Sequence, residues 1–375
     1  MNENGKISWL RLIRTENIGP VTFRTLLEHF GSAEKALERL PDFARKGGRV
    51  KPLRLCSVSE AEKEIDALRK AGGEFIALNE EDYPPQLAVT PDAPPLLAVL
   101  GNKALLKKPY VALVGTRNAS INGKNMARRM AADFVKAGWS VVSGLALGID
   151  AAAHEGALYA ASTEASTAAV LGTGIDVPYP ERNRKLYDAV REKGVLLSDY
   201  PLHTKPQPSN FPRRNRIISG MASGLVVIEA ALRSGSLITA NKALEQGRDV
   251  FAVPANPLDP RAQGVNHLIK TGAPLVESAQ DVLEHLGAFQ APPLSETRFP
   301  VPPPEPETGD ISDISDSDAR MRILQELDAA PADIDALVRE TGLPARTISV
   351  LLVELELAEQ IERLPGNRVV RISPC

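Results

Sequence analysis

The chain has 375 residues, of which 43% are hydrophobic, enough for two or three buried cores. It carries 44 Lys and Arg against 47 Asp and Glu, a formal net charge of −3. This balance argues against a protein that coats duplex nucleic acid nonspecifically, but it permits a local basic groove. Cys56 and Cys375 have no partner pattern, so we expect no disulfide, no metal site and a reducing cytoplasm. The sequence also lacks a signal-peptide stretch and long unbroken apolar runs, so we expect a cytoplasmic protein without a membrane span.

The first 72 residues are expected to form a small helical domain of the sterile-alpha-motif or helix-hairpin-helix type. Apolar residues recur at helical spacing over 7–70, and residues 17–31 read as a glycine turn followed by an amphipathic helix that ends at Gly31. Such a turn can offer backbone N–H groups to a phosphate. Simple packing is the favoured interpretation, because apolar stripes of this kind usually face a core.

The segment 74–108 reads as a linker-like passage with two short strands, at 75–78 and 96–100, separated by prolines. From Tyr110 onward, short apolar runs alternate with helical stretches, two of them near 122–137 and 149–161. We expect strands at 111–114, 140–143, 168–171, 195–198, 225–229, 249–253 and 274–276. This alternation predicts an α/β fold with a Rossmann-like parallel sheet covered on both faces, within a domain that spans 73–288.

Residues 289–318 are rich in proline and then in acids, a composition typical of an extended linker. In 319–375, three helices and a hairpin around 365–367 predict a C-terminal winged helix-turn-helix. Its third helix, 345–359, has one cation and three acids, whereas a groove reader needs a basic face. Protein contact and DNA contact therefore both remain open for this domain.

The loops that follow four of the expected strands are rich in small and hydroxyl residues and lead into helices. Because the carboxyl ends of parallel strands share one edge of a sheet, these loops predict an anion-binding rim of N–H groups. The candidate phosphate-binding residues are Gly115, Thr116, Ser143, Gly144, Gly148, Gly172, Gly174, Ser234, Gly235, Ser236 and Thr239. The alternative is that small residues only permit tight turns between strand and helix.

The segment 205–216 concentrates cations without a single acid and includes an aromatic residue. Guanidinium groups match phosphate oxygens, and an aromatic ring can stack on a base. With Arg117 from the rim, the candidate DNA-binding residues are Arg117, Lys205, Asn210, Phe211, Arg213, Arg214 and Arg216. Three arginines on one helical turn cannot all point the same way, so we expect at least one to pair internally with Glu229 or Asp199. Asn210 is expected to cap the helix, and an ion-paired helix start is the alternative for the whole cluster.

No catalytic residue is expected. Arg117 stands where a dinucleotide-binding loop carries glycine, and the lysine motif of phosphate-binding loops is absent, so we expect no cofactor. Asp150 and His154 lie four residues apart and would suit acid–base chemistry, but no nucleophile accompanies them. We therefore favour structural roles, with Asp150 as a helix cap or a brace for the glycine loop.

Together these motifs resemble the DNA-processing protein A family (DprA/Smf). The resemblance rests on Val114-Gly-Thr-Arg117, residues 143–150, residues 210–219, residues 235–240 and residues 264–269, in order along the Rossmann-like domain. It implies a homodimer that binds single-stranded DNA during natural transformation, protects it and helps to load the RecA recombinase. It also implies DNA contacts at Arg117, Lys205, Phe211 and the neighbouring arginines. Thr116 replaces the serine that the family usually has and keeps the hydroxyl.

The first hypothesis is thus a non-catalytic protein that binds single-stranded DNA. The alternative is a nucleotide-binding Rossmann protein or a phosphoribohydrolase-like enzyme that uses the same rim. The predicted sheet resembles the sheets of such enzymes, which carry a Pro-Gly-Gly loop and a glutamate. In this chain no Pro-Gly-Gly loop follows Glu229. A transcriptional regulator that acts through the winged helix is disfavoured by the acids of its third helix.

Overall fold

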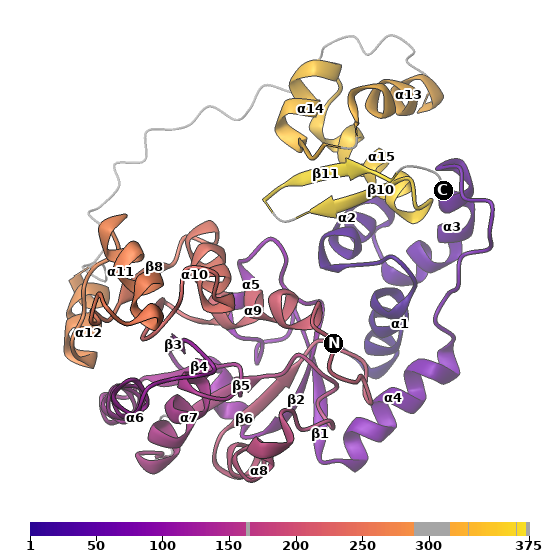
Figure 1. The fold of residues 1–375 in the computed structure, drawn as a ribbon. Helices are drawn as coiled ribbons and strands as arrows, with labels where there is room; N and C mark the ends of the chain where they lie inside the picture. Colours follow the sequence, from indigo (N-terminus) through magenta and orange to yellow (C-terminus); the bar gives the residue numbers. More distant parts are fainter. Residues whose placement is uncertain (163–165, 289–315, 329, 365, 373–375) are drawn as a thin grey trace, which may run out of the picture. The chain divides into compact units, whose positions relative to one another are not determined.

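A computed structural model describes residues 1–162, 166–288, 316–328, 330–364 and 366–372 (Figure 1). The chain divides into two compact units. One consists of Met1–Leu10 and Val58–Phe289, and the other of Arg11–Ser57 and Gln290–Cys375. The N-terminal helices after Leu10 thus group with the C-terminal domain, while the four-part division of the chain stays a prediction. Among the described helices, none is both long and apolar enough to cross a membrane.

The first unit is built on an eight-stranded mixed sheet in the order β1-β2-β6-β5-β4-β3-β7-β8. The strands are β1 (Gly73–Ala77), β2 (Leu96–Gly101), β3 (Tyr110–Val114), β4 (Ser140–Ser143), β5 (Thr167–Val170), β6 (Val195–Ser198), β7 (Gly224–Val227) and β8 (Asp249–Ala252). All strands from β6 to β8 in this spatial order, namely β6, β5, β4, β3, β7 and β8, run parallel to one another. Val111 of β3 lies opposite Val141 of β4 on one side and Gly224 of β7 on the other. β1 and β2 add an antiparallel edge.

The sheet confirms the predicted fold class and corrects two of its details. The segment 74–108 is not a linker, because it supplies both antiparallel strands of the edge. The last predicted strand, 274–276, is reduced to a single parallel bridge between Ala252 and Leu275. The remaining strands were predictable because each is short, mostly apolar and almost entirely buried.

Helices cover both faces of the sheet (Figure 1). Val111 and Leu113 of β3 enter one core with α6 (Ile121–Lys136), α7 (Ile149–Tyr159) and α12 (Ala279–Ala288). Ala112 and Val114 point into the opposite core, since successive strand residues alternate between faces. The second core also includes α5 (Pro85–Ala88), α9 (Asn210–Met221), α10 (Gly235–Glu245) and α11 (Gln263–Lys270). The unit also contains α4 (Val58–Lys70), α8 (Arg184–Lys193) and the 3₁₀ turns η1 (Lys103–Lys107), η2 (Glu181–Asn183) and η3 (Pro260–Ala262).

The second unit combines N-terminal helices with the winged helix domain. Helix α1 (Glu3–Arg14) carries the boundary between the units, and α2 (Pro20–Phe30) and α3 (Ala33–Lys46) follow it. Gly31 ends α2 in the left-handed region at φ +81°, as the predicted glycine stop requires. The winged helix consists of α13 (Asp316–Glu326), β9 (Ala332–Asp333), α14 (Ile334–Thr341), α15 (Ala345–Leu357), β10 (Ile361–Leu364) and β11 (Arg368–Arg371).

The three strands of the winged helix form an antiparallel sheet in the order β10-β11-β9, which includes the predicted hairpin. Ile323, Leu337, Leu352 and Val369 meet in its core, so helices and hairpin fold around one apolar centre. The predicted linker 289–318 ends earlier than expected, because α13 already begins at Asp316. Its part from 289 to 315 lies outside the described residues.

Candidate nucleic-acid interface

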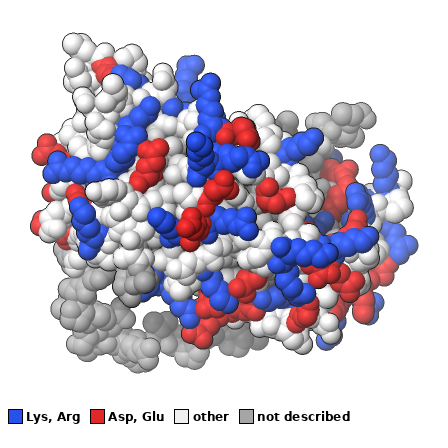
Figure 2. All heavy atoms as spheres, turned by 90° about the horizontal axis from the view of Figure 1, so that it is seen from below, with Lys and Arg blue, Asp and Glu red and all other residues white. Residues whose placement is uncertain are grey.

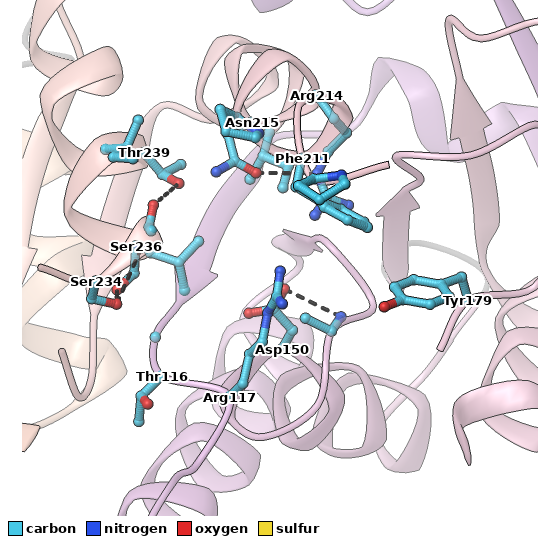
Figure 3. A pocket seen from close by; sticks show the side chains of 18 of the residues that line it. Thr116, Arg117, Asp150, Tyr179, Phe211, Arg214, Asn215, Ser234, Ser236 and Thr239 are labelled. Atoms are coloured by element: carbon cyan, nitrogen blue, oxygen red, sulfur yellow. Dashed lines mark hydrogen bonds between the residues drawn. The ribbon is translucent and has the colours of Figure 1, made fainter. Parts of the chain in front are cut away.

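A cavity of about 670 Å³ opens at the carboxyl ends of β3 and β7. β3 lies between β4 and β7, so the order of the strands reverses at β3. Ligands of such folds bind at this switch point. The cavity is lined from the loop after β3, from the start of α9 and from the start of α10 (Figure 3). Several of the predicted strand-end loops therefore line one cavity, while their binding of anions stays a prediction.

Arg117 and Phe211 meet at this cavity, although 94 positions of sequence numbering separate them. The guanidinium carbon of Arg117 lies 5.3 Å from the centroid of the Phe211 ring, a cation–π distance. The ring of Tyr179 stacks beside Phe211, with centroids 5.5 Å apart and planes inclined by 28° (Figure 3). A smaller cavity of about 60 Å³ is lined by all three side chains. Cation and aromatic rings thus stand together, as the sequence predicted for Arg117 and Phe211.

Tyr179 was missed by the sequence reasoning. It is partly exposed and follows Gly172 and Gly174 in the loop after β5, where it precedes Pro180. A solvent-facing aromatic residue in a strand-end loop was the signal that could have indicated it.

Arg214 is the most deeply buried cation of the predicted cluster, with 4% of its surface exposed. Its Nη1 donates to the carbonyl oxygens of Gly144, at 2.8 Å, and of Val170. Burial lowers the pKa of Arg214 to about 10, while the nearby Asp150 carboxylate favours the charged form. The guanidinium lies at the wall of the cavity but uses Nη1 to join the ends of β4 and β5. Its main role in the described structure is to brace the fold.

Asp150 braces the loop after β4, as one of its two predicted structural roles required. Its Oδ2 accepts hydrogen bonds from the backbone N–H of Gly144 at 3.1 Å and of Ala146 at 3.4 Å. Burial raises the pKa of the Asp150 carboxyl, and the charge of Arg214 acts against that rise. Asp150 and Arg214 are therefore two buried groups of opposite charge that attract one another beneath the rim.

His154 is also structural, which confirms the preferred interpretation. It is fully buried; its Nε2 accepts from the Leu145 N–H at 3.3 Å, and its Nδ1 lies 2.7 Å from Thr167 Oγ1. Because Nε2 accepts, the proton is assigned to Nδ1 and donated to the threonine hydroxyl. Burial lowers the pKa of His154 to about 3, so the ring stays neutral across the physiological range.

The remaining members of the basic segment separate into buried and exposed residues. Arg216 pairs with Asp199 and donates to the Asp92 carbonyl oxygen, so Asp199 is the acid that holds the predicted internal arginine. Glu229, the other acid considered, instead accepts from the N–H and hydroxyl of Ser120. Lys205 and Arg213 are exposed and lie outside the cavity lining.

Asn210 does not cap α9, so that prediction was wrong. The helix begins at Asn210 itself, and the side chain is buried and donates to the Gly172 carbonyl oxygen at 3.1 Å. This bond ties the start of α9 to the end of β5. It positions Phe211, the next residue, at the cavity.

The predicted phosphate-binding loops differ in what their polar groups do. Six of the candidates line the large cavity: Gly115, Thr116, Ser234, Gly235, Ser236 and Thr239. Helix α10 begins there, with Ser234 as its cap, so the positive end of its dipole lies at the cavity. Gly144 and Gly172 line only the small cavity.

For three candidates the structure corrects the predicted role of phosphate donor. The hydroxyl of Ser143 is buried and donates to the Leu113 carbonyl oxygen, and the N–H groups of Gly144 and Gly174 donate to Asp150 and to the Thr204 carbonyl oxygen. Gly148 has φ +83°, and a Cβ there would lie 2.2 Å from the Thr116 carbonyl oxygen. The close approach of the two loops therefore requires glycine at this position, and a phosphate contact of Gly148 stays a prediction.

Charges of both signs are mixed on the surface of this protein. Figure 2 shows cationic and anionic side chains interspersed over the face that it draws. Among the described residues, no group of three or more His, Cys, Asp or Glu side chains forms a possible metal site. The groups that the site offers a ligand are guanidinium groups, stacked aromatic rings, and the hydroxyls and N–H groups of a helix start.

A Rossmann-like sheet with cations, stacked aromatic rings and a helix N-terminus at its switch point defines a protein of the nucleotide- or polynucleotide-binding class. Comparison with known families narrows this class. Residues 74–287 match the model of DNA recombination-mediator protein A, residues 3–67 a DprA-like N-terminal domain, and residues 300–367 the DprA winged helix domain. The chain belongs to the DprA/Smf family.

Individual relatives agree. The chain is 32% identical to Protein Smf of Synechocystis over 97% of this chain and 98% of the relative. It is 46% identical to the DNA processing protein DprA of Streptococcus pneumoniae over 54% of this chain and 71% of the relative.

Solved structures of the family match as well. The crystal structure of DprA from S. pneumoniae superposes with a TM-score of 0.62 at 38% identity, covering 76% of this chain and 98% of the other. A structure of DprA from Helicobacter pylori, described by its single-stranded DNA binding mode, gives 0.52 at 27% identity, covering 58% of this chain and 98% of the other.

Proposed function

We propose that this protein binds single-stranded DNA at the cavity between the ends of β3 and β7 and acts in DNA processing during natural transformation. The observation that carries the proposal is the stack of Tyr179 and Phe211 beside Arg117. Aromatic faces accept any unpaired base, whereas a duplex keeps its bases stacked on each other. The names of the relatives, which include DNA processing proteins and a single-strand binder, support the same function.

Each group has a distinct role in this proposal. Arg117, Lys205 and Arg213 hold phosphates from the open side, since all three are exposed. Phe211 and Tyr179 stack bases, and the start of α10 at Gly235 presents the positive end of its helix dipole to one more phosphate. Arg214, Arg216 and Asn210 support this surface from within.

No step of this function requires bond breaking, so we propose a non-catalytic protein that shields single strands and helps to load RecA onto them. We also propose a homodimer formed through the Rossmann-like domain. Leu232 and Leu244 support it, because each of these apolar side chains near or on α10 is more than half exposed. RecA filament growth on strands coated with a single-strand binding protein, with and without this chain, tests the loading role. Sedimentation velocity tests the dimer.

The binding proposal is tested by fluorescence anisotropy with oligothymidylates of increasing length and a duplex of the same length, at two salt concentrations. We expect preference for single strands and a salt dependence whose slope falls by about 0.7 for each phosphate contact that is removed. Arg117→Ala should weaken binding and reduce the slope. Arg129→Ala, on α6 and also exposed, is the matched control and should bind normally. Normal binding by a folded Arg117→Ala protein would refute this site.

A small phosphorylated nucleotide is the second candidate, because the cavity volume of about 670 Å³ lies in the range of small-molecule sites. Calorimetry with mononucleotides distinguishes the two. Tight mononucleotide binding that oligonucleotides do not displace would favour the small ligand. Weak mononucleotide binding that a longer strand displaces would favour single-stranded DNA.

A further inference from the structure

Helix α15, the third helix of the winged helix domain, is buried on two sides. Ile348, Leu352 and Leu355 enter the core of the winged helix itself. Val353 and Leu357 are fully buried too, yet they do not belong to that core. They are covered within the same compact unit, where α15 packs against α2 and α3 of the N-terminal segment. The second half of α15 therefore has a covering within this chain, whereas Arg346 near its start is exposed.

Polar contacts fix this packing. Arg49, which follows α3, donates from Nη1 to the carbonyl oxygen of Leu357 at 2.8 Å, at the very end of α15. A cation there satisfies an end carbonyl and complements the helix dipole. The same guanidinium pairs with Glu359 at 3.1 Å and with Glu16 at 2.7 Å, and only 7% of the Arg49 side chain is exposed. Arg49 thus acts as a C-terminal cap that comes from another part of the chain.

The three acids that make α15 unsuited to DNA all have partners in the second unit. Glu354 is buried and pairs with Arg320 at 2.8 Å. Glu356 accepts from the Thr22 hydroxyl of α2 at 2.8 Å and also pairs with Arg363. Glu359, just after the helix, pairs with Arg49. The acidity of the third helix is therefore matched by groups that surround it, two of them from the N-terminal segment.

Gly47 shows how closely the two segments approach. A Cβ at this position would lie 2.2 Å from the carbonyl oxygen of Glu354 and 3.1 Å from the Cβ of Ala358. The φ of Gly47 is −69°, an ordinary helical value, so its own backbone does not require glycine. The Gly47 carbonyl oxygen also accepts from the Gln360 side chain at 2.8 Å. Glycine is needed here for the contact with α15.

We propose that the third helix of the winged helix is a docking helix for the N-terminal helices α2 and α3 of the same chain, and that it does not read a DNA groove. The occupant follows from the contacts: Arg49 caps the helix, Thr22 meets its acid, and Gly47 leaves room for its backbone. The winged helix and the N-terminal helical segment then work as one body.

The full chain with Gly47→Ala tests the docking. Alanine suits the local backbone, so each domain should fold, but its Cβ cannot fit against Glu354. Gly19→Ala is the matched control in the same segment, because its Cβ would meet nothing within 4 Å. Spin labels at Val21→Cys and Arg346→Cys, with Cys56→Ser and Cys375→Ser, report the distance between α2 and α15. We expect one narrow distance peak in wild type and Gly19→Ala, and loss of that peak in most molecules of Gly47→Ala.

Three outcomes would overturn the proposal. One is a Gly47→Ala protein that keeps the narrow peak. Another is a mixture of singly labelled chains that gives the same peak, because α15 would then dock on a second copy. The third involves duplex DNA and uses proteins that carry Arg117→Ala. If the duplex abolishes the distance peak, or if adding Gly47→Ala raises duplex affinity tenfold, α15 is a DNA-reading helix that the N-terminal helices cover. A peak in the Arg117→Ala protein that stays unchanged when the duplex is added, together with a duplex affinity that Gly47→Ala leaves unchanged, would support docking as its role.

Discussion

Replacing Arg214 with methionine separates bracing from DNA contact. Methionine keeps much of the apolar length of the side chain and removes the charge, so the site stays filled while Asp150 loses its counter-charge. Leaving a buried charge without its compensating charge typically destabilises a protein by about 3–5 kcal/mol. The carbonyl oxygens of Gly144 and Val170 also lose their shared donor. We therefore expect a loss of about 3–5 kcal/mol in the free energy of unfolding.

This loss should depend on pH with a definite sign. Burial raises the pKa of Asp150 and Arg214 opposes that rise, so the pKa rises further in Arg214→Met. A carboxyl whose folded pKa lies above its unfolded value keeps its proton in the folded state after the unfolded chain has released it. Lowering the pH toward the folded pKa therefore stabilises the folded state. The deficit of Arg214→Met against wild type should be smaller at pH 5 than at pH 7.5.

Urea denaturation at both pH values measures these differences, and a double-mutant cycle isolates the pair. Asp150→Asn keeps an oxygen for the N–H groups of Gly144 and Ala146 and removes the unpaired charge. Added to Arg214→Met, it should restore about 1–3 kcal/mol. The reasoning fails if Arg214→Met unfolds at the same urea concentration as wild type but binds single strands weakly. Arg214 would then contact the ligand.

Three further substitutions address stacking, pH and packing. Phe211→Ala should lower single-strand affinity by about 1–3 kcal/mol with an unchanged salt slope, measured by anisotropy at two salt concentrations, because it removes a stacking surface and no charge; a changed slope would contradict this role. Because burial lowers the pKa of His154 to about 3, the unfolded state binds a proton at this histidine at a higher pH than the folded state does. The free energy of unfolding should therefore fall by about 2 kcal/mol from pH 7.5 to pH 5 in urea titrations, and by less in His154→Gln. Gly144→Ala should cost about 1–3 kcal/mol in the same assay, since its Cβ would lie 2.5 Å from the Arg214 guanidinium, whereas Gly235→Ala has open space and should be nearly neutral.

The sheet could be predicted from the sequence because its strands are local signals. Runs such as 111–114 and 195–197 are apolar throughout, and that pattern means burial on both faces wherever the strand sits. The direction of β1 and β2 could not be predicted, because antiparallel pairing with β6 depends on contacts between residues about 100 positions apart. The same limit explains why 274–276 was expected as a strand and forms only one bridge.

The candidate site was predictable in its location and less so in its details. Strand-end loops must share one edge of a parallel sheet, so Arg117 and Phe211 could be expected to meet. Whether a small residue donates outward or inward depends on partners that the local sequence does not reveal. Gly144 donates to Asp150 instead of to a ligand, and Tyr179 joins the site through the fold of a loop.

The arginines of α9 point in different directions because of the helical period. Successive residues turn by about 100° around the axis, so Arg213 and Arg214 cannot share a direction. Arg213 is exposed, and Arg214 points to the carbonyl oxygens at the ends of β4 and β5. This buried bond holds the start of α9 against the sheet, and with it Phe211, whose ring needs a fixed position to stack beside Tyr179. The buried cation Arg214 therefore fixes the position of the Phe211 ring and of the exposed cations on the same helix. The cations of this acid-free segment thus belong to one local structure, partly inside the fold and partly outside it.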